Sequence, residues 1–84
     1  MYWDVTNIEL IEHLKLKVTF LDGLSGTVKF EPSHLTGVFA SLKDPAFFCQ
    51  AHIESGAVTW PGGVDLAPDA MHKEIKSNGA WVLR

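Results

Sequence analysis

A chain of 84 residues has room for one hydrophobic core, and a 46% share of hydrophobic residues supplies the apolar surface to form it. The formal net charge is -3 and the isoelectric point is near 5.7. Nucleic-acid binding needs clustered Lys and Arg to neutralise phosphates, whereas the 7 basic residues are scattered along this chain. The composition therefore predicts a folded protein that makes no direct contact with DNA or RNA.

The cellular location is expected to be cytoplasmic. The single Cys49 has no partner for an intramolecular disulfide, which fits a reducing compartment. The start at Met1–Asp4 lacks the basic and then apolar pattern of a signal peptide. No apolar run approaches the roughly 20 residues of a membrane-spanning helix, so we expect no membrane partner.

Alternating side chains predict that the first part of the chain is an antiparallel meander of three strands. From Leu14 to Phe20, apolar and polar residues alternate as they do on a strand with one face in water. Alternation resumes from Gly26 to Phe30 after Asp22-Gly23, which predicts a hairpin. Upstream, the apolar phase changes near Thr6-Asn7. A β-bulge there would turn both halves of a first strand inward, with Glu12-His13 as the turn into the second strand.

The middle of the chain predicts one isolated turn and one short helix. A proline cannot donate a ladder hydrogen bond, so Pro32–Leu35 is interpreted as a single helical or 3₁₀ turn that stops at Gly37. Asp44–Cys49 is predicted to be a short helix, because Asp is a good N-cap and the Pro after it has φ preset for a first helical position.

A second hairpin and a second helix follow. Ala51–Glu54 and Ala57–Trp60 each alternate, with Ser55-Gly56 between them as a two-residue turn. The next helix is predicted to open at Pro68-Asp69 and to stop at Asn78-Gly79. Together these patterns predict an α+β fold: an antiparallel meander of three strands plus a second hairpin, with two short helices packed on the sheet.

The end of the chain is unusually apolar for a terminus. The residues after the helix stop are Ala80, Trp81, Val82 and Leu83. Termini are commonly loose unless another part of the protein holds them. We expect this tail to fold back as an edge strand on its own sheet or to add to the sheet edge of a second chain. The chain is interpreted as a single domain over residues 1–84, with a core over 1–76 and the tail over 77–84.

Four stretches together resemble a known family. They are, in this order, Met1–Val5, Val18–Gly23, Gly37–Phe48 and Trp60–Asp69. Over residues 1 to about 75 the chain resembles the bacterial family catalogued as domain of unknown function 2442. The resemblance implies a small α+β fold of meander type, found alone or followed by a helix-turn-helix DNA-binding domain. It also implies a genetic context, because some members lie beside small partner genes in an arrangement suggestive of toxin and antitoxin pairs.

Residues that can carry chemistry have simpler structural explanations here. Among His13, His34, His52 and His72, only His52 has a second zinc-type ligand nearby, which is Cys49. The same pair would suit a nucleophile and its base, yet a small thiol at the end of an apolar helix is expected to be buried by packing. The carboxylates are expected to serve turns and helix starts: Asp22, Asp44, Asp65 and Asp69. We predict no catalytic residue, no metal and no cofactor.

These observations favour a non-enzymatic protein-interaction module. Its partner is expected to be another small protein, in a pair of toxin–antitoxin type, or a second copy of the chain. Because Trp is enriched at interface hot spots, the expected partner surface comprises Trp60, Trp81, Val82 and Leu83, although core packing is the stronger expectation for Trp60. The alternative is a small-ligand-binding sensor or regulatory domain, related to the N-terminal half of helix-turn-helix regulators. An enzyme is the third interpretation.

Overall fold

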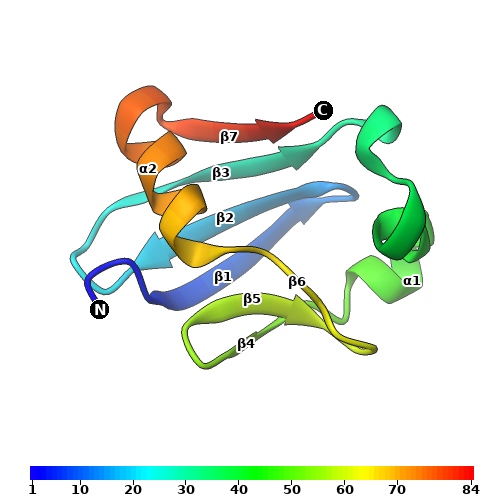
Figure 1. The fold of residues 1–84 in the computed structure, drawn as a ribbon, viewed down its shortest axis with the longest axis horizontal. Helices are drawn as coiled ribbons and strands as arrows, with labels where there is room; N and C mark the ends of the chain where they lie inside the picture. Colours follow the sequence, from blue (N-terminus) through cyan, green and yellow to red (C-terminus); the bar gives the residue numbers. More distant parts are fainter.

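The computed structural model describes residues 1–84 and contains two sheets, with strand orders β1-β2-β3-β7 and β4-β5-β6 (Figure 1). The strands are β1 (Val5–Glu12), β2 (Lys15–Phe20), β3 (Ser25–Phe30), β4 (His52–Glu54), β5 (Ala57–Trp60), β6 (Val64–Asp65) and β7 (Ala80–Leu83). The helical segments are the 3₁₀ helices η1 (Pro32–His34) and η2 (Gly37–Lys43) and the α-helices α1 (Pro45–Phe48) and α2 (Pro68–Asn78). The mixed content confirms the predicted α+β class, and β6 is additional to the predicted strands.

The first three strands form the predicted antiparallel meander. Leu16 of β2 lies opposite Val28 of β3, so the apolar positions of the two strands share one face. The register of β1 against β2 shifts between Val5 and Asn7, which confirms the predicted bulge, and shifts again between Leu10 and Glu12. Because of the first shift, Val5 and Ile8, which belong to different apolar phases, both contact the core. Leu10 lies opposite the buried Leu16 but remains 41% exposed.

The turn between β1 and β2 lies later than expected. Leu14 has φ 68, in the left-handed region that is unfavourable for a branched side chain, so it belongs to the turn and β2 begins at Lys15. The N–H of Phe30 donates to the carbonyl of Leu14 over 2.9 Å, which helps hold this backbone in place.

The second sheet grows from the predicted hairpin. Ser55 and Gly56 have φ 52 and 77, the two positive angles that a type I′ turn requires, and β4 and β5 pair antiparallel on either side. A further turn through Gly62 and Gly63 brings Val64 back beside Trp60, which creates β6. With only two residues, β6 is too short to produce an alternation that a sequence pattern can reveal.

The helical segment before β4 closes one end of the molecule. Asp44 caps α1 as predicted, since its Oδ1 accepts from the N–H of Ala46 over 3.0 Å. Gly37 was expected to stop a turn, but it opens η2 instead, because its φ of 57 lets the chain re-enter a helical path after η1. Both α1 and η2 lie beyond the ends of the strands and not across the sheet (Figure 1).

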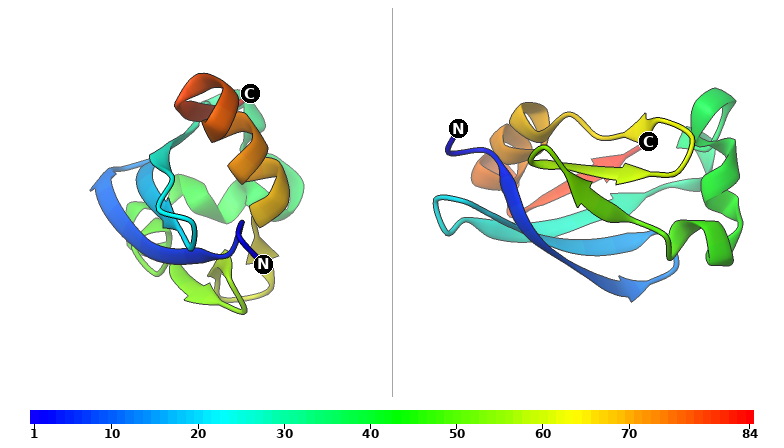
Figure 2. Two further views of the ribbon diagram at one scale, coloured as in Figure 1. Left: turned by 90° about the vertical axis from the view of Figure 1, so that its left-hand side faces the viewer. Right: turned by 90° about the horizontal axis from the view of Figure 1, so that it is seen from below.

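Helix α2 lies across the inner face of the four-stranded sheet, on the same side as the second sheet (Figure 2). It begins at Pro68 and ends at Asn78, as predicted, and Gly79 with φ 78 provides the left-handed stop. Met71 and Ile75, one turn apart, are 0% and 1% exposed and reach the core between the layers. Burial of this apolar stripe is what fixes the helix to the sheet.

The C-terminal tail forms β7 on its own sheet, which is one of the two arrangements expected for it. Immediately after the stop at Gly79, Ala80–Leu83 pairs parallel with β3, with Val28 beside Trp81 and Phe30 beside Leu83. This makes β7 the edge strand of the four-stranded sheet. None of the helices has the length and apolarity that crossing a membrane requires.

Candidate functional site

The edge formed by β7 has two unlike faces, because successive side chains of a strand point to opposite sides. Trp81 and Leu83 share the inner face with Val28 and Phe30 of β3. Val82 faces the other side and remains 37% exposed. The tail is therefore held by its odd-numbered residues.

The backbone of β7 also presents unpaired groups. The N–H groups of Thr27 and Glu31 donate to the carbonyls of Gly79 and Leu83 over 3.4 and 2.8 Å. Since the polar groups of a strand alternate between its two sides, the N–H and C=O of Val82 point away from β3. No strand lies on that side in the sheet order, so this peptide is free to bond to another chain.

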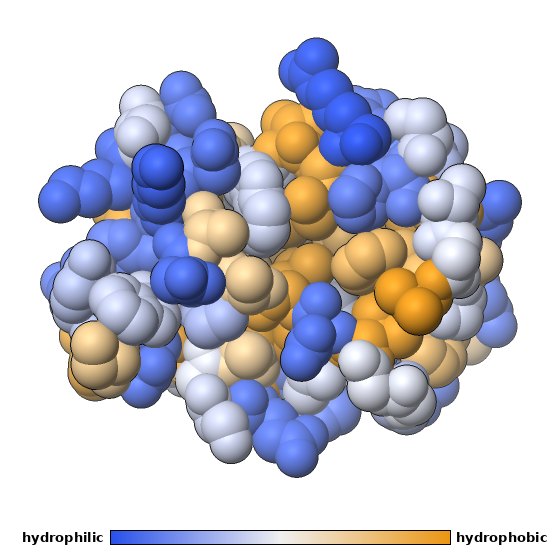
Figure 3. Space-filling model, viewed as in Figure 1, coloured by the Kyte–Doolittle hydropathy of each residue, from blue (hydrophilic) through white to orange (hydrophobic).

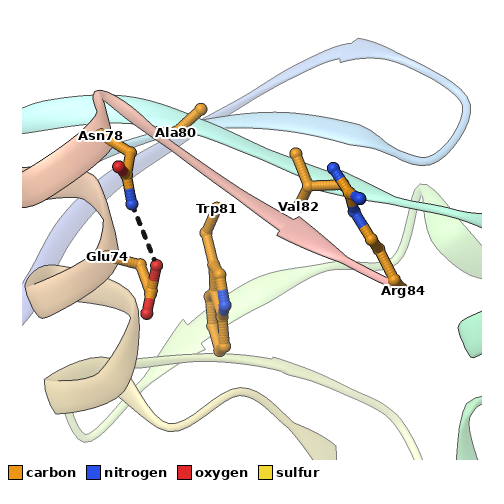
Figure 4. Close-up of a pocket in the computed structure, with 6 residues that line it drawn as sticks. All are labelled: Glu74, Asn78, Ala80, Trp81, Val82 and Arg84. Atoms are coloured by element: carbon orange, nitrogen blue, oxygen red, sulfur yellow. Dashed lines mark hydrogen bonds between the residues drawn. The ribbon is translucent and has the colours of Figure 1, made fainter.

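A groove of about 500 Å³ lies beside this edge, and we call it the β7 groove; its lining residues are Glu74, Asn78, Ala80, Trp81, Val82 and Arg84. Trp81 projects from β7 into the space, with Glu74 of α2 on one side and Arg84 on the other (Figure 4). Glu74 also accepts from the amide of Asn78 over 3.2 Å. The face of the molecule seen in Figure 3 is hollowed between hydrophilic residues, over a hydrophobic floor.

The four residues expected to form a partner surface do not lie together on the exterior. Trp60 is 1% exposed, and its indole N–H donates to the carbonyl of Phe48 over 2.9 Å. Leu83 is 8% exposed. The structure confirms the stronger expectation for Trp60, which belongs to the core. It corrects the assignment of Leu83 to a partner surface, because packing between the layers encloses this side chain. Trp81 and Val82 reach the β7 groove.

A buried histidine and a turn carboxylate form a pair that sequence reasoning missed. Nε2 of His72 on α2 lies 2.8 Å from Oδ2 of Asp22, and the two residues are 50 positions apart in the chain. His72 is only 5% exposed, and its ring packs edge-to-face against the rings of Phe20 and Tyr2, with centroids 4.9 and 5.0 Å away. The helical spacing of His72 from the buried Ile75 is the one sequence signal for its inward position.

The pair changes the acidity of the carboxylate. The hydrogen bond from His72 is the largest influence that lowers the pKa of Asp22 below its ordinary value, and the N–H of Leu24, 3.0 Å from Oδ1, lowers it further. Because a carboxylate can only accept, Nε2 of His72 carries the proton of this bond. Asp22 thus serves the predicted turn and also ties that turn to α2.

A second hollow of about 380 Å³ adjoins this histidine. We call it the Tyr2 hollow, and its lining residues are Tyr2, Trp3, Asp69, His72, Lys73, Lys76 and Ser77. It shares no lining residue with the β7 groove. The hollow lies between α2 and the segment that precedes β1.

The remaining candidate residues are dispersed. Cys49 is exposed, which corrects the expectation of a buried thiol, because α1 ends with this residue outside the core. Nδ1 of His52 donates to the carbonyl of Gln50 over 3.1 Å, and no hydrogen bond joins this ring to Cys49. His13 and His34 donate to the carbonyls of Leu42 and Arg84. No three His, Cys, Asp or Glu side chains lie together in a way that could hold a metal ion.

The fold and these sites define a small α+β domain with an open sheet edge and two shallow hollows. Residues 5–77 match the family model described as Protein of unknown function (DUF2442), and the chain belongs to this family. Comparison with curated proteins and with solved structures found no match. The match ends before β7, so the edge strand lies outside the family model.

Proposed function

We propose that this chain is a non-enzymatic protein-interaction module that accepts an extended segment of another small protein, or of a second copy of itself, along the free edge of β7. The observation that supports the proposal most directly is the position of β7 at the end of the sheet order. The outward peptide groups of Val82 lack a partner there. An added strand would satisfy them with ladder hydrogen bonds, which is how many sheet edges bind peptides.

The side chains around the edge suit this use. Trp81 is partly buried on its own domain and still lines the β7 groove, so it is held in place before a partner arrives. A pre-positioned aromatic ring loses little conformational freedom on binding. Glu74 and Arg84 bring opposite charges to the groove, and they would favour one direction of an incoming strand over the other.

A photo-crosslinking amino acid at position 82 tests the proposal in the native cell. Val82 is replaced by a benzophenone-bearing residue, and the matched control carries the same residue in place of Val38, which is 71% exposed on η2. We expect crosslinked products from position 82 that are absent from position 38. A product of twice the chain mass of 9.3 kDa identifies a second copy, and any other mass identifies a different protein.

Equal product patterns from the two positions, or no product from position 82, would contradict the proposal. A toxin–antitoxin relationship between the chain and such a partner stays a prediction, as does a cytoplasmic location. Finding the crosslinked partner encoded next to this chain would support the first of these.

A further inference from the structure

The Tyr2 hollow has the features of a small-molecule site, and it is independent of the interaction proposed for β7. Its volume of about 380 Å³ falls within the size range of ligand pockets, roughly 300 to 1,000 Å³. It combines cationic groups, a nearly buried imidazole and aromatic rings within one surface depression. Each of these features restricts the kind of ligand that fits.

The cationic groups select for a negative charge. Lys73 and Lys76 lie one turn apart on α2 and both line the hollow. Neither takes part in any of the ion pairs within the chain. Asp69 is the one carboxylate in the lining, so the two ammonium groups outnumber it. The excess of positive charge favours a ligand that carries an anionic group, such as a carboxylate.

The imidazole of His72 supplies a hydrogen-bond acceptor. Because Nε2 donates to Asp22, Nδ1 is the acceptor whenever the ring carries a single proton. Nδ1 makes no hydrogen bond within the chain, and no enclosed side-chain nitrogen or oxygen lacks a partner. Nδ1 therefore keeps some solvent-accessible surface, although His72 as a residue is only 5% exposed. The hollow that His72 lines is where a ligand O–H can donate to it.

The rings of Tyr2 and Trp3 supply an apolar wall. Their centroids are 4.9 Å apart in an edge-to-face arrangement, and Tyr2 remains 56% exposed. A flat ring placed against this wall would remove exposed apolar surface from water. An aromatic ligand suits the wall better than a linear one does.

We infer that the Tyr2 hollow binds a small hydroxylated aromatic acid. Its carboxylate lies toward Lys73 and Lys76, its hydroxyl donates to Nδ1 of His72, and its ring packs on Tyr2. Binding is reversible and involves no covalent step. It gives this domain a ligand-sensing capacity in addition to partner binding.

Titration of the whole chain with three matched compounds tests the inference. The probes are 3-hydroxybenzoate, 3-hydroxybenzamide, which lacks the charge, and benzoate, which lacks the hydroxyl. Backbone amide shifts measured by NMR give both the dissociation constant and the location. We expect shifts centred on α2 and Tyr2, binding of the amide weaker by about tenfold, and binding of benzoate weaker by about threefold.

A pair of double variants separates this site from general charge attraction. K73Q/K76Q should weaken 3-hydroxybenzoate binding about tenfold or more. K15Q/K17Q removes the same charge from β2 and should leave binding unchanged within about twofold, because those side chains lie on the outer face of the sheet. Equal effects of the two double variants, equal affinity for the acid and its amide, or no saturation up to about 10 mM would each overturn the inference.

Discussion

Replacing Leu83 with Ala tests how the C-terminal tail is held. Leu83 is 8% exposed and lies beside Phe30 in the register of β7 against β3. The substitution removes about three buried methylene-sized groups, each worth about 0.8 kcal/mol, so the free energy of unfolding should fall by about 2 kcal/mol. This is the low end of the range of about 2 to 5 kcal/mol for core Leu→Ala changes, since a strand at the chain end can shift toward the space.

The measurement is urea unfolding followed by circular dichroism, with calorimetry for Tm. For a domain of this size, about 2 kcal/mol corresponds to a fall in Tm of about 8 to 16 °C. Val82→Ala is the matched control, because Val82 neighbours Leu83 and faces outward; it should cost less than about 1 kcal/mol. Deleting residues 80–84 should cost more than Leu83→Ala. Small and equal effects of the two substitutions would refute the argument that the inner face of β7 anchors the tail.

Two further predictions concern α2 and its contacts. Gly26→Ala should destabilise the fold by about 1 to 3 kcal/mol in the same unfolding assay. The new Cβ would lie 2.5 Å from Cγ2 of Ile75 and 2.6 Å from the carbonyl oxygen of Gly79, which is closer than such atoms can pack. An unchanged unfolding midpoint would refute this close contact between β3 and α2. Because the pKa of Asp22 is lowered in the folded state, the stability it contributes is present above its ordinary value of 3.8 and is lost as pH falls below that value toward the lowered pKa. In the Asp22→Asn variant, the free energy of unfolding should therefore fall less steeply between about pH 5 and pH 2 than in the wild-type protein. If the free energies of the two proteins change in parallel with pH, the hydrogen bond to His72 contributes nothing to stability.

Local patterns predicted most of the elements, because their causes lie within a few residues of one another. Alternation in β2 and β3 requires only that one face be buried and the other wet. The cap of Asp44 on α1, the turn at Ser55-Gly56 and the stop at Gly79 each follow from the conformational preference of one or two residues. These features would be recognised in any fold that used the same segments.

Local patterns placed other features less well, because competing local signals were present. Leu14 fits the alternation of β2, yet the geometry of the turn takes it into the left-handed region. Cys49 follows two Phe residues, but the end of α1 turns it outward. For such residues the path of the chain beyond the element decides exposure, and neighbouring residue types do not reveal that path.

The apolar sequence of the tail determined that its side chains would be buried, but only the tertiary structure decided against which surface they are buried. Parallel pairing of β7 with β3 depends on α2 delivering the chain to that edge, over contacts that span about 50 residues. Asp22 and His72 are also 50 residues apart in the sequence, and their pairing depends on how α2 lies across the sheet. Sequence fixes which side chains must leave water or find a hydrogen-bond partner, whereas the packing of distant elements selects the partner, because those contacts form only when the layers meet.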